Sequence, residues 1–546
     1  MLRLSTRLLA LLACISAFAT SKPLEHTEFD AVTALQNHGF QVGQYRDLAS
    51  LASTSSNRAC EIACKSLEKH FGADSVDRPD EATYTSYLGT YWSALQSDVH
   101  PYCIFKPSTP EDVSVLVLLS RLAQCPFAVR SGGHAAFAGA SSIEGGITVS
   151  FQNLKGVALS TDKKVASVQP GNTWGSVYSA LQKDDVAVIG GRIENIGVGG
   201  LTTGGGISFF SSLYGLACDN VVAYDVVDAQ GNIVTASQKE NPDLYWALRG
   251  GGNNFGIVVS FHLETIPLPG GRMWGGNLVY EESSFDEVCK AFSATVDNIA
   301  SKDHRAGMWL AMAAQNGTKI ASIEQYYAEP DGHNSPAWEA FKDVPVVSDT
   351  RQNRVLFNYT AELQAMNPDG LREIYYGLSL LASADVLIAA KDIFYEEIGA
   401  LDGVSNLLPV LACQAFTLPI LAKMQKNGGN PLGLEDALAA DRPVYVMQVA
   451  AWWDRQEDDA AVYGVFSQIL NRIKAASVAH GAANVYVYMN YASMFQDVIS
   501  SYGAENKARL KAVAARYDPA GVFQRLQPGY FKLDRAPVPG SGYFSH

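Results

Sequence analysis

Two glycine-rich blocks constrain the fold of this chain more than any other feature. The first, Arg130-Ser131-Gly132-Gly133-His134, directly follows a short apolar run. The second begins about sixty residues later and holds glycines at 190–191, 197, 199–200 and 204–206. Glycine permits positive φ and close approach of the backbone, so such loops can surround phosphates and a ring system with main-chain N–H groups. The two blocks together predict a flavin site, with His134 exposed at its rim.

Two other interpretations of these blocks have to be weighed. A single histidine in a loop is usually an ordinary surface side chain, and only the second glycine block favours a binding role. A dinucleotide-binding fingerprint is the other alternative, but Thr202 stands where its third glycine belongs. The flavin interpretation is therefore preferred.

The length and charge of the chain limit the remaining possibilities. With 546 residues it exceeds one simple core, so we expect two lobes. The net charge is −14 and no run of basic residues is longer than a pair, which argues against a nucleic-acid partner. No later segment offers about 18 uninterrupted apolar residues, so we expect no membrane span.

The first residues are typical of an export signal. Arg3 and Arg7 precede an apolar stretch at 8–18, and Ala17-Phe18-Ala19 has the form that a signal peptidase cleaves. We therefore expect a signal peptide over 1–19 and a secreted, extracellular protein. Sequons at Asn316 and Asn358 predict N-glycans in that compartment.

The cysteines fit an oxidising compartment and not a metal site. Seven of the eight remain after removal of the signal, so at least one thiol stays unpaired within the chain. Their spacing matches no zinc motif, and we predict no metal. Cys60 and Cys64 are four apart on an expected helix, and either could reach Cys103; we favour a Cys64–Cys103 disulfide.

Hydrophobic periodicity divides the chain into parts. A capping box at 108–111 predicts a helix, and further helices are expected at 174–181 and 241–250. Strands are expected at 127–130, 147–151, 165–169, 186–189, 221–228 and 257–264. The Pro-Gly-Gly stretch at 269–271 is the best boundary. Beyond it we expect helices at 284–300, 369–385 and 460–479, strands at 444–452 and 485–491, and an α+β lobe.

Five motifs, in order along the chain, resemble a known family. They are 130–134, 197–200 with 204–206, Cys218-Asp219-Asn220-Val221, the run 243–256, and Tyr488-x-Asn490-Tyr491. Together they resemble the secreted flavin-linked oxidases of the berberine bridge enzyme type, in their fungal form, within the vanillyl-alcohol oxidase superfamily. The likeness covers 101–267 and 488–523. It implies an α+β, two-lobed PCMH-type FAD-binding fold, with a substrate domain built on an antiparallel sheet flanked by helices.

The resemblance also implies a division into domains. After the signal peptide come an N-terminal segment over 20–96 and the FAD-binding domain over 97–270. The substrate domain follows at 271–484, and a C-terminal segment over 485–546 completes the FAD lobe.

The resemblance implies FAD joined covalently to His134. Members of the family often carry a second link from a cysteine, but Ile193 occupies that position here, so we predict a single link. Leu201 replaces a histidine found in many relatives, and Ile196 matches the position that lines the oxygen pocket. The expected cofactor-binding residues are His134, Arg130, Ser131, Gly132, Gly133, Gly139, Gly197, Gly199, Gly200, Leu201, Gly204, Gly205, Asn254, Gly256 and Ile257.

The resemblance points to Tyr491 as the catalytic base, with Tyr488 and Asn490 as its neighbours. In a strand, Tyr488 and Asn490 would share one face and Tyr491 the other, so both tyrosines stay candidates. Tyrosines that merely pack in a buried strand are the alternative. A tyrosine titrates near pH ~10 in water, so a tyrosine base needs help from Arg, Lys or the flavin.

These features favour an oxidase that takes a hydride from a small organic substrate and reduces oxygen to hydrogen peroxide. The substrate class stays open among secondary metabolites, alcohols and sugars. The alternatives are an FAD-dependent dehydrogenase, an oxidative cyclase of natural-product biosynthesis, and a redox-silent extracellular ligand-binding scaffold. We expect a monomer. Gln414, Gln448 and Trp452 could line the substrate pocket, although alternation of apolar residues favours core packing for them.

Overall fold

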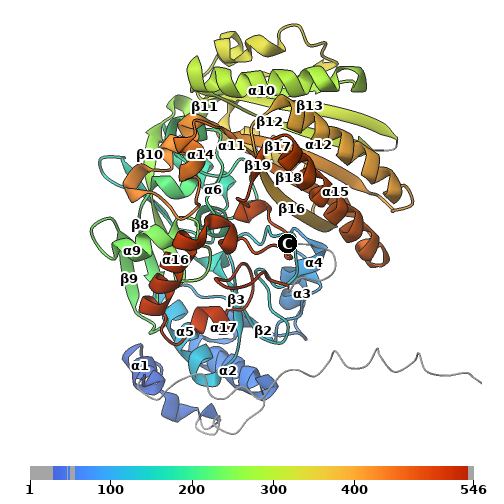
Figure 1. Ribbon diagram of the computed structural model, residues 1–546. Coiled ribbons are helices and arrows are strands. Elements are labelled where there is room, and N and C mark those ends of the chain that lie inside the picture. The colour runs from blue at the N-terminus through green and yellow to red at the C-terminus, as the bar shows by residue number, and fades with distance from the viewer. Residues whose placement is uncertain (1–28, 46, 49–55, 316, 539–546) are drawn as a thin grey trace, which may run out of the picture.

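The computed structural model describes residues 29–45, 47–48, 56–315 and 317–538. Within them, the strands form sheets of four, six and nine strands. The two smaller sheets build one lobe and the nine-stranded sheet builds the other, with long helices along one of its faces (Figure 1). The expected two-lobed α+β fold is therefore confirmed. The predicted signal peptide at 1–19 and Asn316 lie outside the described residues.

The four-stranded sheet carries the first glycine block. Its order is β1 (Val76–Asp77), β2 (Cys103–Phe105), β4 (Ile147–Ser150) and β3 (Phe127–Arg130), and β4 runs parallel to both of its neighbours. Helix α5 (Pro110–Ala123) begins where it was expected, but its capping box lies one residue later than predicted, because Thr109 and Asp112 cap each other. Strand β3 ends at Arg130, as predicted, and so delivers the loop that holds His134.

Two disulfides fasten helix α2 (Ser56–Phe71) to this sheet. Cys64 pairs with Cys103 on β2, which confirms the favoured pairing, and Cys60 pairs with Cys125 just ahead of β3. The other described cysteines are buried free thiols: Cys218, Cys289 and Cys413. The N-terminal segment is thus covalently joined to the sheet on both sides of α5.

The six-stranded sheet carries the second glycine block. Strands β5 (Val157–Leu159), β6 (Val165–Val168), β10 (Ile257–Pro267), β8 (Val221–Val227) and β9 (Ile233–Ser237) are adjacent in that order, and β7 (Val186–Val188) also pairs with β10. Helix α7 (Val198–Thr203) starts after Gly197. A Cβ atom on Gly132 would lie 2.4 Å from the nitrogen of Gly197, so the two glycine blocks touch each other and leave no room for side chains there.

The nine-stranded antiparallel sheet forms the second lobe. It consists of β11 (Arg272–Tyr280), β12 (Ala306–Gln315), β13 (Thr318–Tyr327), β14 (Ser348–Asp349), β15 (Gln352–Val355), β16 (Arg372–Leu381), β17 (Leu408–Phe416), β18 (Val444–Trp453) and β19 (Ala483–Asn484). Helices α10 (Phe285–Ser301), α12 (Ala384–Glu397) and α15 (Asp459–Ala479) lie along one face of it (Figure 1). The opposite face is directed at the glycine blocks.

Two expected elements are wrong. The predicted helix at 369–385 is mostly β16, because its run of apolar and aromatic residues is buried and pairs with β18 along its whole length. The predicted strand at 485–491 is irregular and ends in a 3-10 turn at Met489–Tyr491. This segment packs against both the glycine block and β16, and none of the strand pairings in the described part of the chain includes it.

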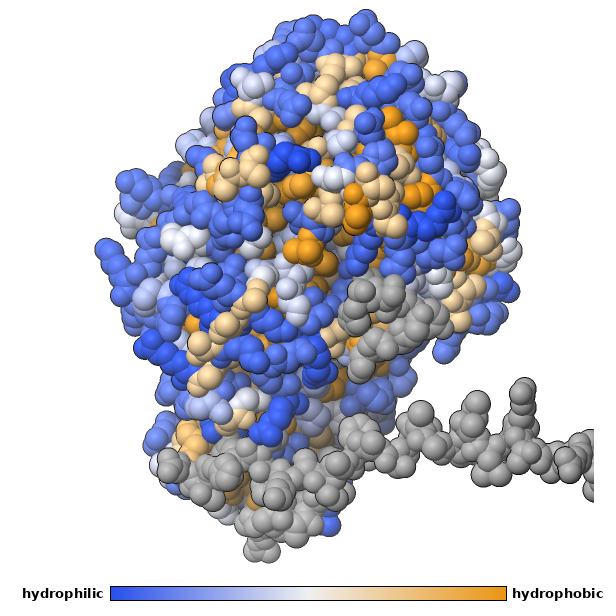
Figure 2. Space-filling view, in the orientation of Figure 1, coloured by the Kyte–Doolittle hydropathy of each residue, from blue (hydrophilic) through white to orange (hydrophobic). Residues whose placement is uncertain are grey.

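The remaining helices connect and cover these sheets. They are α1 (Ala31–Asn37), α3 (Ala82–Leu88), α4 (Ala94–Ser97), α6 (Trp174–Gln182), α8 (Ser211–Tyr214), α9 (Pro242–Leu248), α11 (Leu356–Gln364), α13 (Leu418–Lys423), α14 (Glu435–Ala439), α16 (Ala504–Tyr517) and α17 (Val522–Arg525). The C-terminal helices α16 and α17 return to the first lobe (Figure 1). The face shown in Figure 2 is mainly hydrophilic, and none of the helices in the described part is long and apolar enough to cross a membrane.

Candidate active site

A cavity of about 470 Å³ lies where the glycine blocks face the nine-stranded sheet. One wall comes from the loops after β3 and before α7, and the opposite wall comes from the inner face of the sheet. The irregular segment 488–492 closes one side. The cavity therefore draws on both lobes and on the C-terminal segment, in the size range of ordinary ligand sites.

Most of the expected cofactor-binding residues line this cavity. They are Ser131, Gly132, Gly133, His134, Gly197, Gly199, Gly200, Leu201, Gly256 and Ile257. The residues that do not line it are Arg130, Gly139, Gly204, Gly205 and Asn254.

These five residues have structural contacts instead. The guanidinium of Arg130 lies over the rings of Tyr87 and Tyr91 and donates hydrogen bonds to the backbone beside them. Gly204 and Gly205 make room for the side chains of the 488–490 segment, and Gly139 meets Gly529. Buried Asn254 donates to the carbonyls of Gly251 and Phe531. Arg130 and Asn254 thus shape the loops that surround the cavity.

His134 is inside the cavity wall, so the expectation of an exposed rim position is wrong. Its ring stacks on that of Trp92, with centroids 4.0 Å apart and planes 14° apart. Burial lowers the pKa of His134 to about 4, so the imidazole is neutral at neutral pH. Its Nε2 is buried and has no hydrogen-bond partner among the described residues.

The hydroxyl of Tyr491 is the centre of a hydrogen-bond network in the cavity. Nη2 of Arg192 donates to it over 3.1 Å, and the side-chain amide of Gln414 donates to the same oxygen. Two donors occupy both lone pairs of a neutral phenol, so its proton must point elsewhere. Tyr491 comes from the C-terminal segment, Arg192 from the second glycine block and Gln414 from β17.

Tyr488 has a different environment. Its hydroxyl accepts hydrogen bonds from the backbone N–H groups of Gly206 and Ile207, at 3.0 and 3.1 Å, and from the amide of Asn490 at 3.0 Å. Burial raises the pKa of Tyr488, in spite of these donors. Asn490 also donates to the carbonyl of Leu201. Tyr488 and Asn490 therefore join the C-terminal segment to the second glycine block.

Arg192 was not predicted from the sequence. Its guanidinium lies 4.5 Å from the ring centroid of Trp309, and it forms no ion pair with a carboxylate in the part of the chain that the structure describes. Burial lowers the pKa of Arg192, but the oxygens of Tyr491, Tyr326 and Tyr488 raise it by more, so the group stays charged. The signal in the sequence that could have identified Arg192 is its position as a single cationic residue within the second glycine-rich block.

Strand register explains which side chains the sheet presents to the cavity. Trp309 lies opposite Glu324 on one neighbouring strand and opposite Gln414 on the other, so the three share one face. Gln448 and Trp452 line the same face. The expectation that Gln414, Gln448 and Trp452 pack in the core is thus wrong.

Glu324 is the buried carboxyl of this wall. It accepts hydrogen bonds from the amide of Asn277 at 3.0 Å and from the hydroxyl of Tyr359. Burial raises the pKa of Glu324 in spite of these donors. No group of three or more His, Cys, Asp or Glu side chains in the described ranges could hold a metal ion.

The residues present fit an FAD cofactor. A Cβ atom on Gly200 would meet no other atom within 4 Å, so the backbone at the start of α7 is open to a ligand. Ile193, Ile196 and Leu201 form an apolar surface beside it, suited to a flat ring system. The buried Nε2 of His134 is a polar group that the described residues leave without a hydrogen-bond partner.

Comparisons with known proteins identify the class. The FAD binding domain family matches residues 101–237. The FAD-dependent monooxygenase tpcD of Cochliobolus heterostrophus is 36% identical, over 87% of this chain and 94% of its own length. The FAD-dependent monooxygenase FUP4 of Fusarium proliferatum is 35% identical, over 87% and 95%. Berberine bridge enzyme from Eschscholzia californica has the same fold, with a TM-score of 0.69 and 18% identity over 88% and 99% of the two chains.

The protein is therefore an FAD-dependent oxidoreductase. Within that class, it belongs to the same family as the fungal FAD-dependent monooxygenases tpcD and FUP4, and it has the fold of berberine bridge enzyme, as the motifs predicted. The interpretation as a redox-silent scaffold is set aside.

Proposed function

We propose that the protein is a secreted oxidase that takes a hydride from a carbon bearing a hydroxyl group in a small organic molecule. FAD, when bound, would accept the hydride and pass the two electrons to oxygen, which leaves as hydrogen peroxide. The observation that carries this proposal is the pair of N–H donors on the oxygen of Tyr491 inside the cavity.

The role of Tyr491 is that of a base for the substrate hydroxyl. Arg192 contributes a positive charge and Gln414 an amide N–H, and both stabilise negative charge on the phenol oxygen. That oxygen can therefore hold the proton that leaves the substrate as the hydride departs. Tyr488 is less suited to this role, because its three donors would fill all three lone pairs of a phenolate oxygen and leave none for a substrate proton, and because burial raises its pKa.

FAD is proposed to be attached through a single link to His134. The imidazole is neutral, and so has a free electron pair for a bond to carbon. Ile193 lines the cavity at the position where many relatives place a second, cysteine link, and the described lining residues include no cysteine. The loops at 131–134, 197–201 and 256–257 would hold the rest of the cofactor.

The sheet wall favours an apolar substrate with a few hydrogen-bonding groups. Ala311, Val410 and Ala412 form its middle, whereas Glu324 and Gln448 supply polar groups beside them. A sugar would leave many hydroxyls facing the apolar part, at a cost in free energy for each unpaired group. An apolar secondary metabolite is therefore preferred over a sugar as the substrate.

Secretion as a monomeric glycoprotein is part of the proposal. The expected signal at 1–19 supports it, and the two disulfides are typical of proteins that mature in an oxidising compartment. Asn358 is exposed on α11, where a glycan could be attached.

One experiment tests the core of this proposal. The secreted protein is purified and precipitated with acid, and the yellow colour is followed in pellet and supernatant, alongside His134→Ala. We expect the colour to stay with the wild-type pellet and to move to the supernatant in the variant. Peroxide release is then measured on a panel of apolar alcohols and phenols. Absence of peroxide with every compound would contradict the oxidase assignment.

A monooxygenase is the second candidate, because both curated relatives described above carry that name. It would require an added reductant and would place one atom of labelled dioxygen in the product. An oxidase requires no reductant and transfers no label. A dehydrogenase would reduce a dye and release no peroxide, and an oxidative cyclase would yield a ring-closed product.

A further inference from the structure

The loop that carries His134 is held in place by a segment that precedes the matched FAD binding domain region, residues 101–237. This segment, residues 87–98, runs from the end of α3 through α4, beside the first sheet (Figure 1). Trp92 lies between the two helices and is only 4% exposed. Its indole covers one face of the His134 imidazole at a centroid distance of 4.0 Å. The stack restricts rotation of the histidine ring about its side-chain bonds.

Gln96 holds the backbone on both sides of His134. Its Nε2 donates to the carbonyl of Gly133 at 3.3 Å and to that of Ala135 at 2.9 Å. Its Oε1 accepts from the backbone N–H and the hydroxyl of Ser141, at 3.0 and 2.8 Å. The side chain is fully buried, so no water competes for these four bonds.

The segment is itself anchored to the other lobe. The carbonyl of Trp92 accepts a hydrogen bond from Gly370 at 2.7 Å, and Ala94 donates to Leu371 at 2.8 Å. Arg372, at the start of β16, also forms an ion pair with Asp98 at 3.2 Å. The ring of His134 is therefore positioned by a support that spans both lobes and not by its own flexible glycine loop.

We propose that Trp92 and Gln96 are positioning residues for the covalent attachment of FAD to His134. Trp92 fixes the plane of the imidazole, and Gln96 fixes the backbone from which the ring projects. The inference rests on the proposed function, through the single covalent link.

The attachment reaction needs this alignment. A C–N bond forms between a ring nitrogen of His134 and the 8α carbon of the flavin, while one 8α C–H bond and the imidazole N–H bond break. Two protons leave to solvent. Two electrons pass to the flavin ring and then to dioxygen, which together with two protons becomes hydrogen peroxide. Because the attacking lone pair lies in the imidazole plane, a freely rotating ring reaches the productive geometry less often.

The test compares two substitutions of Trp92 by smaller apolar side chains, one aliphatic and one aromatic, together with one substitution of Gln96. Trp92→Leu removes the stacking ring and Trp92→Phe keeps a flat one, while Gln96→Met removes the four hydrogen bonds. Trp338→Phe is the matched control, because Trp338 is also 4% exposed but packs in the core of the other lobe. Each protein is prepared without flavin and mixed with FAD, and two quantities are followed with time. These are total bound flavin in the folded protein and the fraction that resists acid.

We expect all variants to bind FAD, and expect attachment to be at least tenfold slower in Trp92→Leu and severalfold slower in Gln96→Met. Trp92→Phe and Trp338→Phe should match the wild type. Equal attachment rates in Trp92→Leu and Trp92→Phe would overturn the role of Trp92, and an unchanged rate in Gln96→Met would overturn that of Gln96. A wild type that binds FAD but never retains it in acid shows a different failure, that of the covalent link itself. Melting temperatures, measured in parallel, separate slow attachment from loss of fold.

Discussion

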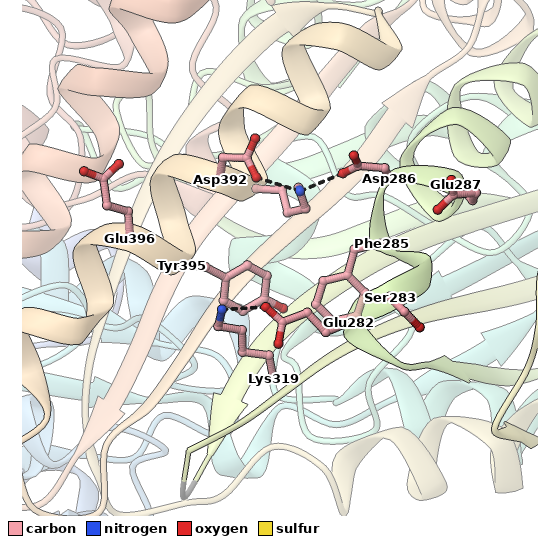
Figure 3. A pocket seen from close by; sticks show the side chains of 10 residues that line it. Glu282, Ser283, Phe285, Asp286, Glu287, Lys319, Asp392, Tyr395 and Glu396 are labelled. Carbon is pink, nitrogen blue, oxygen red and sulfur yellow. Dashed lines mark hydrogen bonds and ion pairs between the residues drawn. The ribbon is translucent and has the colours of Figure 1, made fainter.

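The molecule has two concave sites in which lysine or arginine meets tyrosine, and they treat charge in opposite ways. In the outer site, between α10 and α12, Lys391 contacts Asp286 at 2.7 Å and Asp392 at 2.6 Å, and Lys319 contacts Glu282 at 2.6 Å beneath Tyr395 (Figure 3). In the inner cavity, Arg192 has phenol oxygens and an indole face around it, and it forms no ion pair among the described residues. A cation neutralised by carboxylates has little effect left on other groups, whereas Arg192 can stabilise charge on Tyr491.

The first prediction removes the reacting oxygen of the inner cavity. Tyr491→Phe should lower kcat/KM by about 10²–10⁴-fold, the usual contribution of a positioned base. Bound flavin and its spectrum should stay close to those of the wild type, because the ring remains. Tyr395→Phe in the outer site is the control and should leave the rate unchanged. An active Tyr491→Phe would assign the base to another group.

The second prediction removes the cation that distinguishes the two sites. Arg192→Met keeps the length of the side chain but loses the charged hydrogen bond to Tyr491, a loss of about 1.5–3 kcal/mol. We therefore expect kcat/KM to fall about 10–150-fold, mainly in kcat. Arg192→Lys should recover part of the rate. A fall in the outer-site variant Lys391→Met as large as that in Arg192→Met would remove the contrast between the sites.

The third prediction concerns Glu373, a fully buried carboxyl on β16 for which the hydroxyl of Ser93 and the charge of Arg372 only partly offset the cost of burial, while Asp369 adds to that cost. Burial raises the pKa of Glu373 to about 9, so the folded protein holds a proton that the unfolded chain releases near pH ~4.3. The free energy of unfolding should therefore fall as pH rises between these values, by up to about 1.4 kcal/mol per pH unit. Glu373→Gln should remove this slope in melting curves recorded at pH 5, 7 and 9. A slope that persists in the variant would belong to other groups.

The smallest effect is expected in the outer site. Lys391→Met removes contacts to two exposed carboxylates, and such surface pairs contribute about 0–1 kcal/mol. Its melting temperature and its kcat/KM should both stay within error of the wild type. High salt should reduce even the small effect on stability.

Local sequence signals predicted the elements that carry the site but not the contacts that complete it. The strand at 127–130 and the capped helix after Thr109 were found because their patterns lie within a few neighbouring residues. Arg192 meets Tyr491 across 299 residues, and Gln96 reaches Ala135 across 39. No periodic pattern encodes such pairings, because the fold as a whole creates them.

The same limitation applies to the sheet wall. Gln414, Gln448 and Trp452 lie on strands that are rich in apolar residues, and only strand register reveals which face each presents. The segment 369–385 was predicted as a helix, since the partner strands that make it β16 lie far away in sequence. Tertiary pairing decides both cases.

The two disulfides mean that the FAD-binding region is not a portable module. Both bonds start on α2, outside residues 101–237, and end inside that region, one at Cys103 on β2 and the other at Cys125, just ahead of the strand that leads into the His134 loop. A chimera made by exchanging only 101–237 between relatives would inherit Cys103 and Cys125, and its fit would depend on whether the recipient supplies their partners. Gene shuffling within this family should therefore join fragments ahead of residue 56, so that all four cysteines of the two disulfides come from the same parent as the FAD-binding region.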